Sequence, residues 1–401
     1  MDELPKETHQ NRDRYDQIIF ALLVVFLLCT SFSIALSEIG YFSALSLLII
    51  KRIVSRNFSY PRTPVDYFLL GYVFAEVMAT IFAIDKTYSL LYLQRRILLL
   101  PIVYILIDNI TSLKDLKVLF GALILSAVGV SVWSLVDIVF YFREYLLFER
   151  RLSEFQIYMT AGGIMMIAVL LILPFVVHKQ TPKKIRIAAL LITVPLIINL
   201  LFTFTRSSWL GFLAGVVVMG GLRYRKLIAP VIAVVLLIIF LSTPEMKERM
   251  LSIVDPSHPA NVSRLHMWKT GINIFKAYPL FGIGDVGIEI IWDKYAEPGW
   301  DPEGHLHNNF IMWMVTLGAV GTVALVALFL SVWIVFYNIE KKFRDDWFIN
   351  SMALGGLSVI VGFHVNGLFE WNFGDAEIIT IIWAIIGLIL AAEKLSYRVS
   401  G

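Results

Sequence analysis

The chain reads His305-Leu-His-Asn-Asn-Phe-Ile-Met-Trp-Met-Val-Thr-Leu-Gly-Ala-Val-Gly321 where a polar histidine patch runs directly into an apolar helix. At about 100° per residue, His307 and Gly318 would share one face of that helix, with Gly318 about 16 Å deeper. Gly321 continues the stripe of small residues. Such a helix places an imidazole at the water boundary of a membrane and leaves room for close packing below it. We predict that it is the active-site helix, and the alternative is that His305 and His307 are polar residues ending a loop.

The composition is that of a membrane protein. Of the 401 residues, 58% are hydrophobic and 13% are aromatic, which a soluble domain of this length does not reach. The net charge of +3 is too small to indicate a nucleic-acid partner, and the basic residues stand in short runs between apolar segments. The single cysteine, Cys29, excludes an internal disulfide and a cysteine metal cluster. We expect neither a metal nor a cofactor.

The apolar segments predict an all-α polytopic membrane protein with about twelve transmembrane helices. Segments long enough for a hydrocarbon core of about 30 Å lie near 17–36, 66–84, 116–141, 159–178, 185–204, 306–336, 350–369 and 374–393. Shorter segments lie near 38–52, 94–109, 207–222 and 227–242. The chain then divides into helices 1–9 within residues 1–242, a long loop at 243–305, and helices 10–12 within 306–401. Most of the 34 Lys and Arg residues face the cytoplasm if the N-terminus does, so the loop should face outward.

The long loop is expected to contain an amphipathic helix. Prolines divide most of it into short pieces, but residues 261–278 contain none. Apolar side chains recur there at helical spacing, at Leu265, Trp268, Ile272 and Phe275. This spacing predicts a helix on the outer membrane surface, with Trp268 as its interfacial anchor. Arg264 would project from the first turn, beside Asn261 and Ser263 as candidates for the helix cap.

Several arginines lie at outer span ends, against the usual charge bias. Arg206, in Thr205-Arg-Ser-Ser-Trp-Leu-Gly211, stands between two spans, and Arg95 and Arg96 open the fourth predicted span from the outer side. Three more lie in the outward loop after the fifth span, at Arg143, Arg150 and Arg151. An arginine between apolar helices is costly unless it reaches the interface or binds an anion. Together they predict a phosphate-bearing ligand, and interfacial anchoring is the alternative.

These segments resemble a known family. His307-Asn308, nine residues and then Gly318-Ala-Val-Gly321 resembles the signature of bacterial O-antigen ligases. The segment around Arg206 resembles the arginine-bearing element that the O-antigen ligase and polymerase superfamily carries upstream of a large periplasmic loop. The stretch from Arg264 through Trp268 to Gly284 is similar to the second arginine element, within that loop. The order of the motifs extends the resemblance over most of the chain.

The resemblance implies a metal-independent, inverting glycosyltransferase in the bacterial inner membrane, with its active site facing the periplasm. Such enzymes transfer a glycan from undecaprenyl diphosphate to the lipid A-core oligosaccharide, so both substrates and the phospholipid bilayer are the expected partners. By motif match His307 would be the base, and Arg206 and Arg264 would hold the diphosphate. The chemistry agrees, because a sugar hydroxyl needs a general base and imidazole titrates in the useful range. Arg95 and Arg96 are further candidates for the diphosphate.

Other residues are supporting candidates: His305, Asn308, Gly318 and Gly321 from the first motif, and two carboxylates. Glu370 and Asp375 flank the turn between the last two spans. Either could orient the imidazole or bind the acceptor sugar, and a solvated turn is the alternative.

Two alternatives to the ligase remain open. Glu76 and Asp137, within the third and fifth predicted spans, would suit the proton relay of a secondary transporter. No internal repeat is evident, and the motifs gather on one face, which favours an enzyme. Within the superfamily, a growing glycan as acceptor would make the protein a polymerase, and a protein serine would make it an O-oligosaccharyltransferase. The compact loop favours the ligase.

Overall fold

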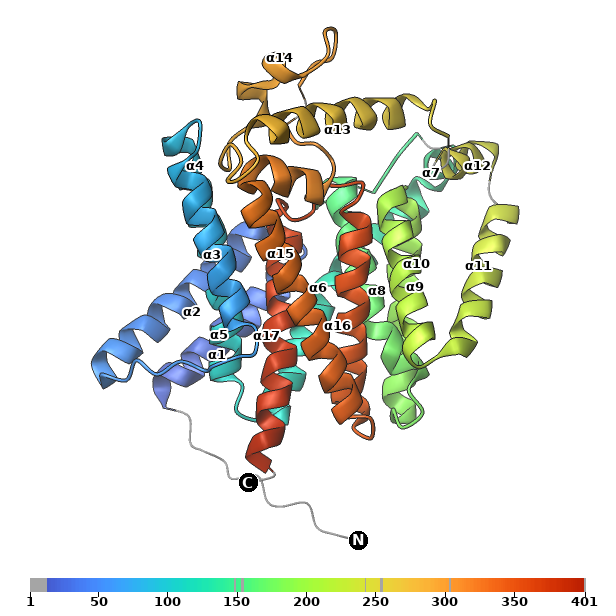
Figure 1. Ribbon diagram of the computed structural model, residues 1–401. Helices are drawn as coiled ribbons and strands as arrows, with labels where there is room; N and C mark the ends of the chain where they lie inside the picture. Colours follow the sequence, from blue (N-terminus) through green and yellow to red (C-terminus); the bar gives the residue numbers. More distant parts are fainter. Residues whose placement is uncertain are drawn as a thin grey trace.

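The computed structural model describes residues 13–147, 149–152, 155–241, 243–252, 255–302 and 304–399, and every regular element in these ranges is a helix. This confirms the all-α class. Most of the helices pack in a bundle (Figure 1). They are α1 (Arg14–Cys29), α2 (Ile34–Ser55), α3 (Asp66–Ile81), α4 (Lys86–Ile97), α5 (Pro101–Asn109), α6 (Leu113–Phe140), α8 (Tyr158–Val177), α9 (Lys183–Phe202), α10 (Arg206–Leu222), α11 (Ile228–Leu241), α15 (Asn309–Lys342), α16 (Trp347–Asn366) and α17 (Ala376–Val399).

Further helices gather at one end of the bundle, at the top of Figure 1. They are α7 (Phe142–Leu146), α12 (Pro244–Leu251), α13 (Pro259–Ala277) and α14 (Trp292–Tyr295). Two single 3-10 turns complete the structure, η1 (Arg225–Leu227) and η2 (Ile288–Ile290). The start of α1 and the end of α17 lie at the opposite end (Figure 1).

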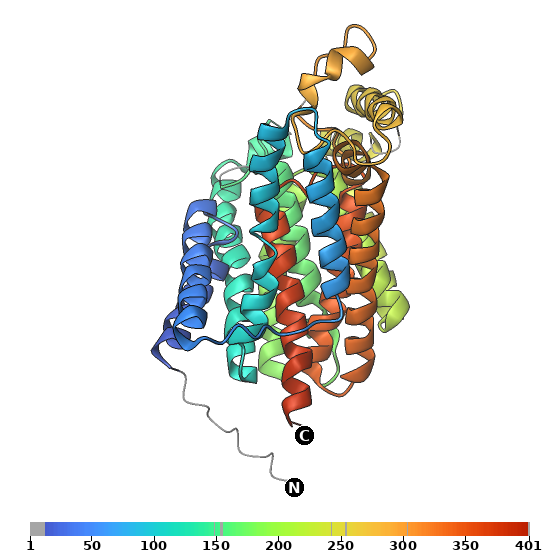
Figure 2. The same cartoon turned by 60° about the vertical axis from the view of Figure 1, so that its left-hand side comes forward.

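Eight helical segments of the described chain are long and apolar enough to cross a membrane. They are α2, α4 with α5, α6, α8, α9, α15, α16 and α17. Helices also occupy the other four predicted segments, but α1, α3, α10 and α11 have only 16, 16, 17 and 14 residues. The count of twelve spans and the side of the membrane that each end faces therefore stay predictions. Within the bundle, α8, α16 and α17 are largely buried, whereas α1 and α2 pack together along one side (Figure 2).

Helix α4 begins earlier than the sequence predicted. The Asp85 side chain accepts a hydrogen bond from the Tyr88 backbone N–H (2.9 Å) and caps the helix, so α4 starts at Lys86. Arg95 and Arg96 therefore lie about 14 Å along the helix from its start and do not open it. A turn at Leu98–Leu100, followed by Pro101 at the first position of α5, divides the two helices.

The predicted continuous helix from His307 to Gly321 is wrong. Asn308 caps α15 by accepting a hydrogen bond from the Ile311 N–H (3.0 Å), so His307 precedes the helix, in the left-handed region at φ 46°. Gly318 interrupts α15 with φ 65° and ψ −165°. His307 and Gly318 thus do not share a helix face.

The segment 278–285 fills the break in α15. The N–H groups of Ala319 and Val320 donate to the carbonyls of Pro279 (2.8 Å) and Leu280 (3.2 Å). A Cβ atom at Gly318 would lie 2.3 Å from the Leu280 carbonyl oxygen, so only glycine fits. Gly318 therefore makes room for a loop and not for a neighbouring helix. At Gly321, a Cβ atom would instead meet Leu317 of the same helix.

Helix α13 confirms the helix predicted at 261–278, and it lies across the upper end of the bundle in Figure 1. His258, rather than Asn261 or Ser263, caps it, with Nδ1 accepting from the Ala260 N–H (3.3 Å). Of the apolar face predicted to lie on the membrane, Leu265 is exposed, so that contact with the membrane stays a prediction. The buried residues are Met267, Thr270, Gly271 and Ile274.

The role predicted for Trp268 differs in the structure. Its indole N–H donates to the Leu306 carbonyl (3.0 Å), and its ring packs against Phe369. Trp268 therefore fastens α13 to the segment that carries His307, and its predicted contact with the bilayer surface stays a prediction.

Candidate functional site

A cavity of about 440 Å³ lies where α13 crosses the starts of α8 and α10. Its walls come from the segment before α8, the first turns of α8, α10 and α13, and the residue before the α15 cap. The lining residues are Arg151, Tyr158, Met159, Thr205, Arg206, Ser207, Pro259, Ala260, Ser263, Arg264, Met267 and His307. Three residues singled out from separate motifs, Arg206, Arg264 and His307, thus meet in one space.

Arg206 is the first residue of α10 and is only 7% exposed. Its guanidinium donates to the Ser252 carbonyl (2.6 Å), to Ser252 Oγ (2.8 Å) and to Asn261 Oδ1 (3.1 Å). The Asn261 amide donates in turn to the Ser252 carbonyl (2.7 Å), which explains why Asn261 does not cap α13. These neutral acceptors fix the direction of the guanidinium without neutralising its charge.

Two further arginines face the same cavity. Arg264 reaches it from α13, and Arg151 lies with its guanidinium carbon 4.6 Å from the centre of the Tyr158 ring. No acidic residue is among the described residues that line the cavity. The N-terminus of α10 adds the positive end of a helix dipole. The cavity is therefore suited to an anion, and phosphate matches guanidinium geometry best.

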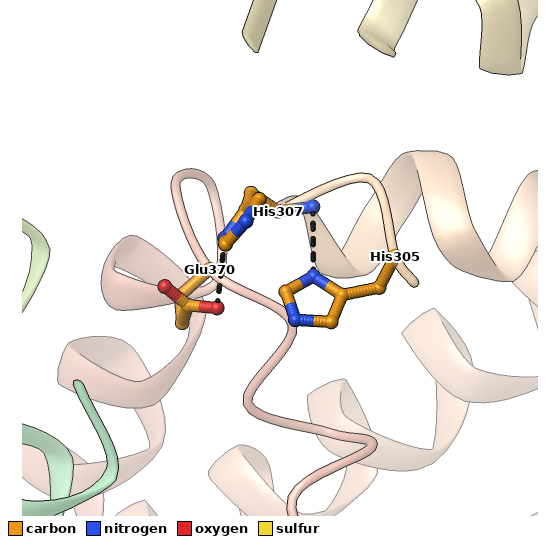
Figure 3. Close-up of side chains that lie close together, drawn as sticks. All are labelled: His305, His307 and Glu370. Atoms are coloured by element: carbon orange, nitrogen blue, oxygen red, sulfur yellow. Dashed lines mark hydrogen bonds and ion pairs between the residues drawn. The ribbon is translucent and has the colours of Figure 1, made fainter. Parts of the chain in front are cut away.

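His307 is held by a buried carboxylate (Figure 3). Its Nδ1 lies 3.0 Å from Glu370 Oε1, and Glu370 is 7% exposed. The backbone N–H of His307 donates to His305 Nδ1 (3.3 Å), and the two imidazole rings are 4.2 Å apart, centre to centre. Of the two carboxylates considered from the sequence, Glu370 is thus the one that contacts His307.

The electrostatics of Glu370 define the tautomer of His307. Burial acts to raise the pKa of the Glu370 carboxyl, but the hydrogen bond with His307 and the charges of His307 and His305 outweigh it, so this pKa is lowered. An ionised carboxylate only accepts hydrogen bonds, so the proton of the neutral ring lies on Nδ1. The second ring nitrogen, Nε2, is then the basic one, as in a histidine that serves as a general base.

The same three side chains are the candidate metal ligands of the described chain. His305, His307 and Glu370 each offer one donor atom, and these atoms lie within 4.8 Å of one another. In the structure, however, His305 Nδ1 accepts the His307 N–H and His307 Nδ1 faces Glu370. A divalent ion bound through these nitrogens would have to displace both hydrogen bonds. The observed geometry is that of an oriented imidazole.

Arg95 and Arg96 do not line this cavity. Arg96 is paired with two buried carboxylates, with its Nε 2.6 Å from Asp285 Oδ2 and its Nη1 3.3 Å from Glu76 Oε1. Arg95 lines a separate cavity of about 360 Å³ between α1, α2, α4 and α17. The structure therefore does not bring Arg95 and Arg96 together with Arg206, Arg264 and His307 in one cavity.

Asn308 and Asp375 have structural partners. Asn308 caps α15, and its amide also donates to the Leu368 carbonyl (2.9 Å), which ties the residue next to His307 to the loop carrying Glu370. Asp375 caps α17 by accepting from the Ile378 N–H (3.2 Å), and it also accepts from the Thr160 hydroxyl. Asp375 therefore joins the starts of α8 and α17 and does not contact His307.

The two acids that suggested a transporter are both compensated locally. Glu76 accepts from the Tyr72 hydroxyl (2.7 Å) and pairs with Arg96. Asp137 accepts from the Tyr145 hydroxyl (2.6 Å) and from Arg150 (2.6 and 2.8 Å). Fixed pairs of this kind favour a structural role over a proton relay.

Sequence reasoning missed Asp285, and it named Arg151 only as one of several arginines that together predict a phosphate-bearing ligand. Asp285 directly follows the Tyr278–Gly284 turn, and Arg151 was one of three basic residues in its segment. In each case only the fold identifies the partner.

Comparison with known proteins yields one family. Residues 188–326 match the family model described as O-Antigen ligase. The matched span includes Arg206, Arg264, His307, Gly318 and Gly321, while Arg151 and Glu370 lie outside it. A search of the curated proteins finds no match.

Proposed function

We propose, on the premise that the chain belongs to the O-antigen ligase superfamily, that it is an O-antigen ligase. In this proposal it transfers a glycan from undecaprenyl diphosphate to the lipid A-core oligosaccharide at the periplasmic face of the bacterial inner membrane. The observation that carries the proposal is the meeting of Arg206, Arg264 and His307 in one cavity without an acidic lining residue among those described.

His307 acts as the general base in this reaction. The acceptor hydroxyl attacks the anomeric carbon of the donor glycan, and Nε2 of His307 takes its proton. The new glycosidic bond forms as the bond from the anomeric carbon to the diphosphate oxygen breaks, so a single displacement inverts the configuration. Glu370, 3.0 Å from Nδ1, keeps the ring oriented and stabilises the imidazolium that forms.

The arginines stabilise the leaving diphosphate. Its negative charge grows as the glycosidic bond breaks, and fixed positive groups around it lower the barrier. Arg206 is held in place by Ser252 and Asn261 before the substrate arrives, so it needs little reorganisation. Arg264, Arg151 and the N-terminus of α10 complete the binding site. These groups supply the charge stabilisation that a metal ion supplies in other glycosyltransferases.

The polymerase and the protein O-oligosaccharyltransferase of the same superfamily would share this chemistry and differ in the acceptor. The segment 243–305, between α11 and α15, is called the external segment here. Its described parts form only α12, α13, α14 and η2, which is a small surface for a protein acceptor. This favours a glycan acceptor over a protein acceptor, and so a ligase or a polymerase over a protein O-oligosaccharyltransferase.

The acceptor can be tested directly. The purified protein is given lipid-linked glycan with or without rough lipopolysaccharide, and the products are separated by gel electrophoresis. We expect product only when lipopolysaccharide is present. Longer glycan chains from the donor alone would identify a polymerase, and unchanged donor in both reactions would contradict transferase activity.

A further inference from the structure

Arg96 lies where three parts of the outer end of the bundle meet. Its Nη1 is 3.3 Å from Glu76 Oε1 on α3, and its Nε is 2.6 Å from Asp285 Oδ2 on the segment after α13. Its guanidinium carbon lies 5.5 Å from the ring centre of Trp371 and 5.3 Å from that of Phe373, in the loop between α16 and α17. One side chain therefore bridges α3, the external segment and the loop that carries Glu370.

The bridge is buried. Glu76 is 1% exposed and Asp285 is 7% exposed. Buried carboxylates need a nearby cation, and removing it leaves uncompensated charge in a region of low dielectric constant. The Asp285 N–H also donates to Ser89 Oγ (3.2 Å), so α4 holds Asp285 through both its backbone and its side chain.

The residues just before Asp285 also contact α15 and the residues between α3 and α4. The Ile283 and Gly284 N–H groups donate to the Val315 (2.9 Å) and Thr316 (3.0 Å) carbonyls of α15, and the Ile84 N–H donates to the Ile283 carbonyl (3.0 Å). Phe281 stacks on Phe82, with ring centres 4.9 Å apart. Because this segment directly follows α13, the same contacts fix the helix that carries Arg264.

The contacts of Arg96 with Trp371 and Phe373 involve the loop 367–375, which carries Glu370. Trp371 directly follows Glu370, and its backbone N–H donates to Glu370 Oε1 (3.1 Å). The Phe373 N–H donates to the Asn309 side chain (3.1 Å), and the Asn309 N–H donates to the Gly367 carbonyl (2.7 Å). Trp371 and Phe373, whose rings contact Arg96, thus belong to the loop that orients His307.

We propose that Arg96 is a positioning residue, which locks the segment after α13 and the loop 367–375 in the relative arrangement that transfer requires. The proposal rests on the proposed function for its catalytic consequence. It assigns Arg96 to the alignment of Glu370 and His307, and not to the diphosphate.

The kinetic test changes both residues of the Arg96–Asp285 pair. Asp285→Asn keeps the Arg96–Glu76 pair and changes only the external segment, so it should fold even if Arg96→Met does not. We expect each variant to lower kcat about tenfold, with KM for the donor within about twofold of wild type, because alignment acts on the chemical step. The double variant should also lose about tenfold, not about a hundredfold, because both changes open the same lock.

Hydrogen exchange provides a readout that does not depend on glycan transfer. In detergent, Asp285→Asn should raise amide exchange in both segments 278–291 and 367–375. Arg95→Met is the matched control, since Arg95 is adjacent but points to another cavity, and it should leave exchange in both segments unchanged.

The outcomes separate the two proposals. Raised exchange in both segments together with the kcat loss supports the positioning role. Exchange that stays unchanged in 367–375, or a kcat loss of about a hundredfold in the double variant, overturns it. If the wild-type protein transfers no glycan, the proposed function fails, and the exchange comparison still decides whether Arg96 locks the two segments.

Discussion

At the scale of single residues, the arrangement of His307 depends on contacts that the following helix, α15, does not supply. Its backbone is in the left-handed region at φ 46°, and its ring is set by Glu370 and lies against His305. The motif predicted the reactive imidazole but not its partner, because Glu370 is 63 residues away and a turn carboxylate has many possible contacts.

Removing the imidazole should stop the chemical step. We expect His307→Ala to lower the transfer rate by about a hundredfold or more while donor binding stays within about twofold, because a general base acts after binding. Single-turnover transfer and equilibrium binding of labelled donor measure the two quantities. The control is His266→Ala, whose half-buried ring lies beside Glu297 and stacks on Trp300 and does not line the cavity. Near-normal turnover in His307→Ala would exclude this residue as the base.

Arg206 should not be replaceable by lysine. Its fork donates to Ser252 and Asn261 at once, and a lysine ammonium cannot reproduce that planar geometry. We therefore expect Arg206→Ala to abolish measurable transfer and Arg206→Lys to recover about a tenth of it or less. Initial rates of transfer at saturating donor compare the two variants with the wild-type protein. Full activity in Arg206→Lys would show that charge alone is sufficient and that the fork has no role.

Chelation tests whether His305, His307 and Glu370 are used as a hydrogen-bonded group or as metal ligands. If the imidazole is the base, EDTA should leave transfer within about twofold of the untreated rate, and added Mg²⁺ or Zn²⁺ should not raise it. Activity that disappears with EDTA and returns with a divalent ion would instead assign these three donors to a metal.

At the scale of elements, the positions of α13 and α15 followed from hydrophobic spacing, but their details did not. Periodicity located α13 within two residues at each end, yet its buried face is Met267, Thr270, Gly271 and Ile274. The break in α15 was not predictable, because it is imposed by the 279–284 segment, which is distant in sequence. The hydrophobic spacing of one segment cannot show which distant loop packs against a glycine in it.

The break predicts a specific sensitivity to substitution. Gly318→Ala would place a Cβ atom 2.3 Å from the Leu280 carbonyl oxygen at φ 65°, and we expect a loss of about 1–3 kcal/mol in stability. Gly129→Ala in α6 is the matched control, because its Cβ would meet nothing within 4 Å. Thermal unfolding in detergent compares the two variants. Equal midpoints would contradict the assigned role of Gly318.

At the scale of the whole molecule, apolar segments predicted where the helices lie, and arginines at the predicted span ends indicated where charge gathers. The cavity containing Arg206, Arg264 and His307 was predictable because the sequence placed all three at one end of the predicted spans. Arg95 and Arg96 show the limit of this reasoning. Adjacent residues on a helix point about 100° apart, and only the packing of α4 shows that Arg96 meets Asp285 while Arg95 faces another cavity.

The most direct test of the account probes the cavity from outside the membrane. Ser263 lines it, so Ser263→Cys in a chain with Cys29→Ala gives one thiol at the proposed site. In spheroplasts, a membrane-impermeant maleimide should label this thiol, an undecaprenyl diphosphate analogue should protect it, and the labelled protein should no longer transfer glycan. Labelling from the cytoplasmic side alone, or full transfer by the labelled protein, would contradict the claim that glycan transfer occurs in this cavity.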